Sequence, residues 1–142
     1  MTAIIHRPPP TGSAPRRRFG DSLLRTSMRA DATLCAGAGL LVAFAADPLS
    51  RLSGLSASSE WVGGAALVGY GAALYALAAV PWIRAVGLGV LVVNVVFAAA
   101  ALGVLAAGVL PLTPAGVAMV LATVAATLGF VYLQYLGVRR LA

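Results

Sequence analysis

The sequence contains few of the residues from which active sites and metal centres are built. Among 142 residues it has one cysteine, one histidine, four acidic residues and no lysine. A single cysteine forms neither an internal disulfide nor a cysteine metal cage. The histidine, His6, lies beside a proline-rich stretch near the N-terminus. We therefore expect no metal, haem or other cofactor.

The scarcity of charge inside the apolar segments excludes further classes. We expect no acidic, basic or histidine side chain at mid-membrane depth, where proton-coupled transporters and pumps normally need one. The length resembles that of small multidrug-resistance transporters, but those depend on a glutamate in the first span. Membrane thiol oxidoreductases of the vitamin K epoxide reductase type need paired cysteines. No G-x-S-x-G or H-E-x-x-H motif occurs, so we expect a protein that is not an enzyme.

Apolar residues make up most of what is present. The chain is 61% hydrophobic and 10% charged, whereas soluble domains carry roughly 25% charged residues. A soluble fold of this size has no means of covering so much apolar surface, so we expect the partner to be a lipid bilayer. The arginines flank the apolar runs and do not form a basic face, which argues against nucleic acid.

The hydropathy pattern predicts an all-α membrane protein. We expect an up-down-up-down bundle of four transmembrane helices within residues 19–142, preceded by a disordered basic tail over residues 1–18. The predicted spans cover approximately residues 28–46, 60–80, 83–110 and 113–138. Trp61 and Trp82 bracket the second span and are separated by about 31 Å of helix, as expected of two interfacial belts.

Polar residues ahead of the apolar runs predict where helices begin. Glu60 falls in the first turn of the second span, where the helix dipole favours an anion. A short interfacial helix is expected between the first two spans, with Pro48 at its first position. The predicted N-caps are Asp21, Asp47, Ser58 or Ser59, and Thr113 ahead of Pro114.

The segment before the first span has more than one interpretation. Phe19, Leu23, Leu24 and Met28 could face lipid on a basic amphipathic helix at the membrane surface, or the segment could simply begin the first span. The residues Ala43-Phe44-Ala45 also resemble a signal-peptidase site, and Arg16–Phe19 loosely resembles a twin-arginine signal. The distance from Phe19 to the apolar run at Leu34 argues against both signals. Cleavage of the first span as a signal peptide therefore remains only as the alternative interpretation.

The arginines also predict the orientation. With the N-terminus inside the cell, only Arg51 lies outside. The absence of lysine and the abundance of alanine, glycine and valine are typical of a bacterium with GC-rich DNA. We therefore expect the bacterial inner membrane, with both termini in the cytoplasm. The nine arginines on the cytoplasmic side are Arg7, Arg16, Arg17, Arg18, Arg25, Arg29, Arg84, Arg139 and Arg140.

Asn94 is the leading candidate for a functional residue because it is the only asparagine and lies near the middle of the third span. A carboxamide at that depth needs hydrogen-bonding partners, either on another helix or on a bound ligand. Thr123 and Thr127 are possible partners, although each can also bond its own helix. Five further polar side chains lie toward the cytoplasmic half, namely Tyr70, Tyr75, Tyr132, Gln134 and Tyr135. They form either an interfacial belt or a polar pocket that opens inward.

These features favour a non-enzymatic accessory or structural subunit that packs against a membrane partner or against itself. The alternative is a carrier or binder of a small apolar or lipid-like molecule near Asn94. The Asp47-Pro48 pair, Asn94 and the ending Gln134–Arg140 resemble those of uncharacterised small four-span bacterial integral membrane proteins. That resemblance implies the architecture and no activity.

Overall fold

The computed structural model describes residues 15–141, with side chains from residue 19 onward, as five α-helices with no β-strand in that range. The prediction of an all-α fold is confirmed, but there are five helices where four were expected. Residues 1–14 of the predicted tail lie outside the described residues, whereas residues 15–18 form the first turn of a helix. The helices are α1 (Pro15–Phe44), α2 (Ala46–Ser53), α3 (Ala57–Leu77), α4 (Ile83–Ala107) and α5 (Pro114–Arg140).

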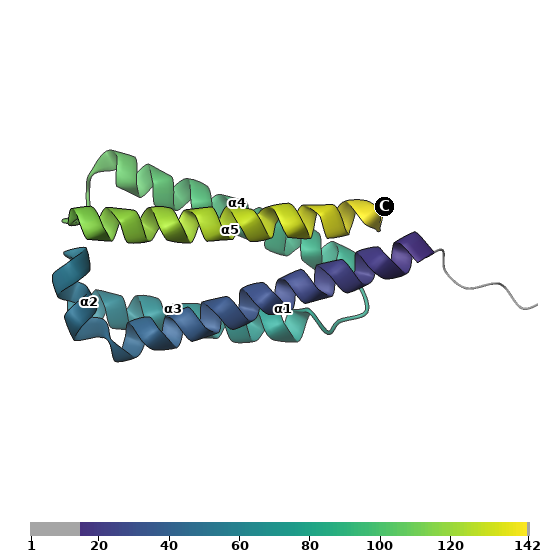
Figure 1. Cartoon of the computed structure of the whole chain (residues 1–142), viewed down its shortest axis with the longest axis horizontal. Coiled ribbons are helices and arrows are strands. Elements are labelled where there is room, and N and C mark those ends of the chain that lie inside the picture. Colours follow the sequence, from purple (N-terminus) through teal and green to yellow (C-terminus); the bar gives the residue numbers. More distant parts are fainter. Residues whose placement is uncertain (1–14, 142) are drawn as a thin grey trace, which may run out of the picture.

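The four long helices form two pairs, α1 with α3 and α4 with α5, as Figure 1 shows. Helix α1 also packs against α5, whereas α3 and α4 contact each other only slightly. The chain turns by 91° between α1 and α2, so α2 crosses one end of the molecule (Figure 1). The start of α1 and the end of α5 lie together at the opposite end, which we call the arginine-rich end (Figure 1).

Glycines allow α1 and α3 to approach closely as an antiparallel pair. A Cβ atom built on Gly64 would lie 2.6 Å from the carbonyl oxygen of Gly39 and 2.6 Å from the amide nitrogen of Ala43. A Cβ atom on Gly71 would lie 2.6 Å from the carbonyl oxygen of Ala32. Such contacts between backbones are the means by which helices in lipid gain van der Waals energy.

The apolar core lies toward the arginine-rich end. Leu24 and Met28 of α1 are fully buried there, with Leu74 of α3 and Val138 of α5. The expectation that Leu24 and Met28 face lipid on a surface helix is therefore wrong. Both residues belong to the beginning of one continuous helix that runs to Phe44, as the second interpretation of that segment had it.

Three of the predicted N-caps are wrong and one is confirmed. Asp21 lies inside α1 and accepts a hydrogen bond from Arg25, while Asp47 lies within α2, which begins one residue earlier. Ser56, and not Ser58 or Ser59, accepts the bond that caps α3. Thr113 caps α5 as predicted, with Pro114 in its first turn. Ser56 is as good an N-cap residue as Ser58 or Ser59, so the sequence alone did not show which serine begins the helix.

Backbone and polar contacts close the α2 end. The amide of Thr113 donates to the carbonyl oxygen of Ser53 at 2.9 Å, and the Thr113 hydroxyl donates to the carbonyl of Leu52. The buried Ser53 hydroxyl in turn donates to the Glu60 carboxylate. Glu60 lies in the first turn of α3, as predicted. These bonds join α2 to the beginnings of both α3 and α5.

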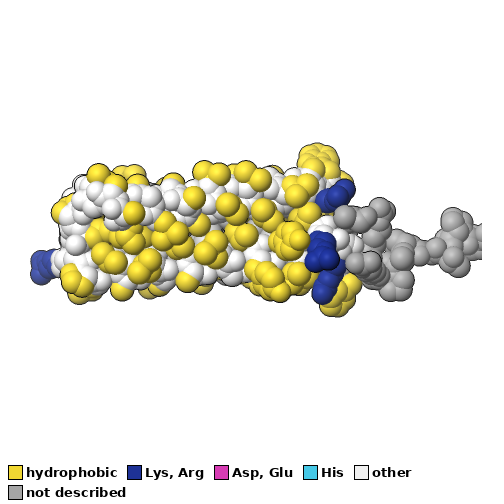
Figure 2. Space-filling view, turned by 90° about the horizontal axis from the view of Figure 1, so that it is seen from above, with side chains coloured by type: hydrophobic (Ala, Val, Ile, Leu, Met, Phe, Trp, Pro, Cys, Tyr) yellow, Lys and Arg dark blue, Asp and Glu magenta, His cyan; other side chains and the backbone are white. Residues whose placement is uncertain are grey.

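Two helices are long and apolar enough to cross a membrane, α4 and α5, and the bent pair of α1 and α2 would make a third. In the most apolar windows of α4 and α5, only 17% and 11% of the residues are buried. Helix α3 is not among the candidates, because four glycines, two tyrosines, Trp61 and Glu60 dilute its apolar content. Figure 2 shows a surface of apolar side chains that runs between arginines at the two ends.

Candidate polar site

A cluster of five polar side chains lies between the helix pairs, and we call it the buried polar cluster. Helix α1 contributes Asp31 and Cys35, and α3, α4 and α5 contribute Tyr70, Asn94 and Gln134 respectively. Asp31, Asn94 and Gln134 are 4%, 4% and 0% exposed. The four long helices therefore meet through polar atoms at one level of the bundle.

The Asp31 carboxylate is the centre of this cluster. Its Oδ2 atom accepts hydrogen bonds from Asn94 Nδ2 at 3.2 Å and from Gln134 Nε2 at 3.0 Å. Its Oδ1 atom accepts a weaker bond from the Cys35 thiol at 3.5 Å. Two amide donors from different helices thus converge on one carboxylate oxygen, which is how a buried carboxylate is solvated in the absence of water.

Asn94 connects this carboxylate to α3. Its Oδ1 atom accepts a hydrogen bond from the Tyr70 hydroxyl at 2.7 Å, and its Nδ2 atom lies 3.4 Å from Gln134 Oε1 as well as donating to Asp31. Both ends of the carboxamide therefore have partners on other helices. Among residues 19–141, every buried side-chain nitrogen and oxygen has a hydrogen-bonding partner.

The cluster lies well inside the bundle, on the side of the arginine-rich end. Asn94 is ten residues along α4 from Arg84, or about 15 Å, and Asp31 is six residues along α1 from Arg25, or about 9 Å. No arginine in the described part of the chain forms an ion pair with Asp31, since the ion pair found there joins Arg25 to Asp21. Asp31 is therefore an acidic side chain buried inside the bundle, which the sequence analysis did not expect.

The predicted site residues divide into two groups. Asn94 and Gln134 lie together in the buried polar cluster. Thr123 and Thr127 instead donate to the carbonyls of Met119 and Thr123 on their own helix, each at 2.9 Å. Their proposed contact with Asn94 is therefore not made.

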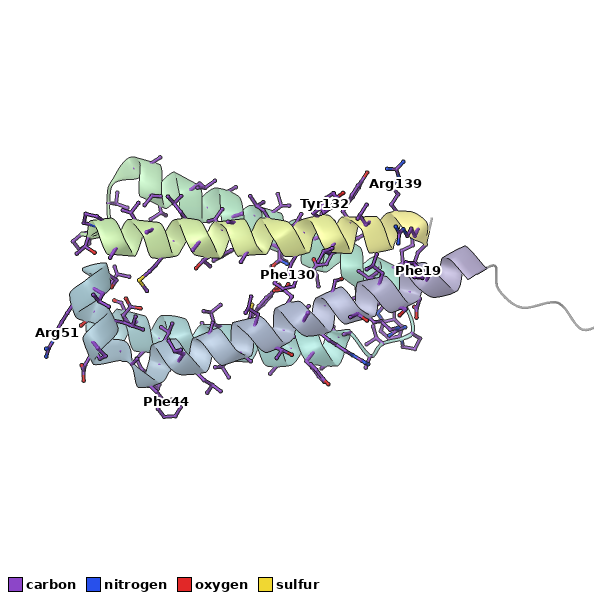
Figure 3. The ribbon with its side chains drawn as sticks, in the orientation of Figure 1. Phe19, Phe44, Arg51, Phe130, Tyr132 and Arg139 are labelled. Atoms are coloured by element: carbon purple, nitrogen blue, oxygen red, sulfur yellow. The ribbon has the colours of Figure 1, made fainter. Side chains whose placement is uncertain are left out.

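Tyr75 and Tyr132 also lie away from the cluster. Tyr75 and Tyr132 are 56% and 61% exposed, and Tyr132 points outward from α5 in Figure 3. Neither side chain is available to an inward-opening pocket around Asn94. Tyr70 of α3 is the tyrosine that joins the cluster, because it is partly buried, packs against the core and donates its hydroxyl hydrogen to Asn94.

Sequence reasoning missed Asp31 and Cys35 as members of a polar site. Asp31 precedes the apolar run at Leu34 and was not among the predicted site residues, although helical spacing offered a signal. Asp31 lies seven residues after Leu24 and three after Met28, and Cys35 follows four residues later. That spacing puts all four on one face of α1. Leu24 and Met28 are fully buried, so the face that carries Asp31 is the face that packs inward.

Within the described residues, no group of three or more histidine, cysteine, aspartate or glutamate side chains is arranged to hold a metal ion. Comparisons with family models, with curated proteins and with solved structures found no match for the chain. The fold therefore defines a class only. It is an all-helical protein with two or three helices apolar enough to cross a membrane.

Proposed function

We propose that the chain is a non-enzymatic accessory or structural subunit of the bacterial plasma membrane. In this proposal α1, α3, α4 and α5 cross the bilayer in an up-down-up-down order and both termini lie in the cytoplasm. The exposed apolar faces of α4 and α5 support membrane insertion, since more than four fifths of their apolar windows lie outside the core. Arg51 lies at the opposite end from Arg139 (Figure 3), in keeping with the predicted excess of arginine on the cytoplasmic side.

The observation that best supports the structural role is that both polar atoms of the Asn94 side chain are hydrogen-bonded to other helices of the bundle. Its oxygen is bonded to Tyr70 and its nitrogen to Asp31, with Gln134 alongside. A residue that held a small apolar or lipid-like ligand would be expected to keep a polar atom free for it. The cluster instead joins four helices to one another, which is the role of interhelical polar contacts in membranes.

Exposed small residues supply the surface for a partner. Ala99, Gly103 and Ala107 of α4 are exposed, and a Cβ atom on Gly103 would meet nothing within 4 Å. The stripe therefore lies open on the surface of the described part of the chain. A second membrane helix, from another protein or from another copy, would find room to approach closely there.

Cysteine labelling tests the topology. In a Cys35→Ser background, a cysteine at the exposed Ser58 should react with an impermeant thiol reagent added to intact cells. A cysteine at the exposed Ser22 should react only after the membrane is opened. Labelling of position 22 and protection of position 58 in intact cells would overturn the orientation.

Co-purification tests the subunit role. In mild detergent, Gly103→Leu should release a partner or convert a dimer to a monomer, because the new side chain keeps the approaching helix away. Gly63→Leu on α3 is the matched control, since it also enters open space. Loss of the assembly in both variants, or in neither, would contradict a partner on this face of α4.

Asp31 supports a second candidate, a carrier that couples transport to a proton or a small cation. A buried carboxylate without a cationic partner in the described part of the chain is unusual for a purely structural contact. Asp31→Asn keeps the shape of the side chain and removes its charge. If the variant is stable and complements a deletion strain, the structural role holds. If the variant is stable and fails to complement, the carrier becomes the favoured function in place of the structural role.

A further inference from the structure

A second polar feature lies on the outer side of α1, away from the buried polar cluster. A shallow groove of about 700 Å³ runs along α1 beside α3. Its polar end is formed by Thr26 and Arg29 of α1 with Tyr75 of α3, and its other end by Leu34, Gly37 and Ala38. The groove is within the size range of sites that bind small molecules.

The polar end of the groove carries the positive charge of Arg29, which is positioned by the Tyr75 ring. The guanidinium carbon of Arg29 lies 5.9 Å from the centre of the Tyr75 ring, which is a cation–π contact. Within residues 19–141 no acidic side chain pairs with Arg29, and none lines the groove. The edge of the guanidinium therefore retains its hydrogen-bond donors for an anion.

The remainder of the groove is suited to a hydrocarbon chain. Gly37 lies eight residues from Arg29, so the groove extends for about 12 Å along the helix. A Cβ atom on Gly37 would meet nothing within 4 Å, and this missing side chain leaves the floor of the groove open. The Thr33 hydroxyl donates to the carbonyl of Arg29 at 2.8 Å, so it offers no free donor along the apolar part.

The position of the groove matches the level of a lipid headgroup. Arg25, one turn before Arg29, donates to the carbonyls of Ala78 and Val80 beyond the end of α3, at 2.8 and 3.0 Å. Arg29 and Tyr75 therefore lie next to the end of the predicted span, with Gly37 and Ala38 deeper in the hydrocarbon. An anion at Arg29 and a chain along Gly37 would belong to one amphiphilic molecule.

We propose that this groove binds an anionic phospholipid of the leaflet at the arginine-rich end. The phosphate contacts Arg29 beside Tyr75, and one acyl chain lies along Leu34, Gly37 and Ala38. The inference rests on the proposed insertion of α1 in the membrane. It concerns a site separate from Asn94, since Asn94 lies in the cluster between the helix pairs and Arg29 is exposed.

Native mass spectrometry of the full chain in detergent tests the site, with phosphatidylglycerol and phosphatidylcholine of identical acyl chains as the probes. The wild type should retain phosphatidylglycerol preferentially. Arg29→Gln should weaken that binding about fivefold, the effect of one arginine near an anionic surface. Arg139→Gln, which removes an exposed arginine elsewhere at the same end, should not change it.

Gly37→Leu tests the acyl part without touching the charge. It should reduce binding of both lipids, whereas Gly129→Leu on α5, which also enters open space, should not. Equal retention by Arg29→Gln and Arg139→Gln, or by the two leucine variants, would overturn the proposal. Carbonate extraction of membranes distinguishes failure of the lipid site from failure of membrane insertion. A protein that stays in the membrane without preferring phosphatidylglycerol contradicts the lipid site alone, and one that is extracted contradicts membrane insertion itself.

Discussion

At the arginine-rich end of the bundle, large apolar side chains are fully buried beside a close backbone approach at Gly137, whereas toward the α2 end the helices meet mainly through close backbone approaches. Leu24, Met28 and Leu74 are at most 1% exposed in the first region. In the second, Gly39 and Gly64 bring α1 and α3 together, and Thr113 bonds the backbone of α2. The buried polar cluster lies between the two regions.

This difference predicts which substitutions the bundle tolerates and which destabilise it. Glycine contacts have no flexible side chain that can move aside, so an added side chain must separate the helices. Side-chain cores and polar contacts lose stability in smaller steps, because neighbouring groups relax partly into the space. The glycine contacts should therefore give the largest effects, followed by the polar contacts near the arginine-rich end, with the exposed threonine hydroxyls last.

The largest effect is expected from Gly64→Leu. Its Cβ atom alone would lie 2.6 Å from two backbone atoms of α1, so we expect a loss of about 3 kcal/mol, at the upper end of overpacking effects. The neighbouring Gly63→Leu enters open space and should cost little. Reversible unfolding in detergent measures both. Equal stability of the two variants would show that α1 and α3 do not pack in this register.

Arg25→Leu should have an intermediate effect. The side chain satisfies the carbonyls of Ala78 and Val80 and is paired with Asp21, so we expect its loss to cost about 1 to 2 kcal/mol. Arg139→Leu, at an exposed position on α5, should cost less than about 0.5 kcal/mol. Identical melting temperatures for the two variants would mean that Arg25 does not hold the turn between α3 and α4.

The smallest effect is expected from Thr123→Val and Thr127→Val. Both hydroxyls bond carbonyls of their own helix, and valine is an apolar side chain of nearly the same shape as threonine. Each change should shift stability by less than about 0.5 kcal/mol and leave complementation intact. A large loss from either variant would place these threonines in contact with something outside the described residues.

The sequence predicted the helical class, the cap of α5 at Thr113 and the inclusion of Asn94 and Gln134 in a polar site. It did not predict the burial of Asp31, because this residue precedes the apolar run at Leu34 and was not among the predicted site residues. Burial of Asp31 depends on amides that arrive from α4 and α5. Contacts between residues more than sixty positions apart are set by how the helices pack, and no local pattern encodes them.

The number of helices shows the same limit. A short interfacial helix after the first span was expected from the spacing of leucines, and α2 occupies that segment. Its 91° turn relative to α1, however, depends on contacts with α3 and α5 that close the end of the bundle. Small residues at four-residue spacing, such as those around the exposed Gly103, suit an interior face and an exposed face equally, so spacing alone does not place them.

A double-mutant cycle at Asp31 and Asn94 tests most directly whether the buried polar cluster is a structural contact. Asn94→Leu alone should cost about 2 kcal/mol, since it removes donors from a buried carboxylate. The double variant Asp31→Leu with Asn94→Leu should be more stable than the sum of the single losses predicts, by at least about 1 kcal/mol, because no uncompensated charge remains. Losses that add to within about 0.5 kcal/mol would contradict the account.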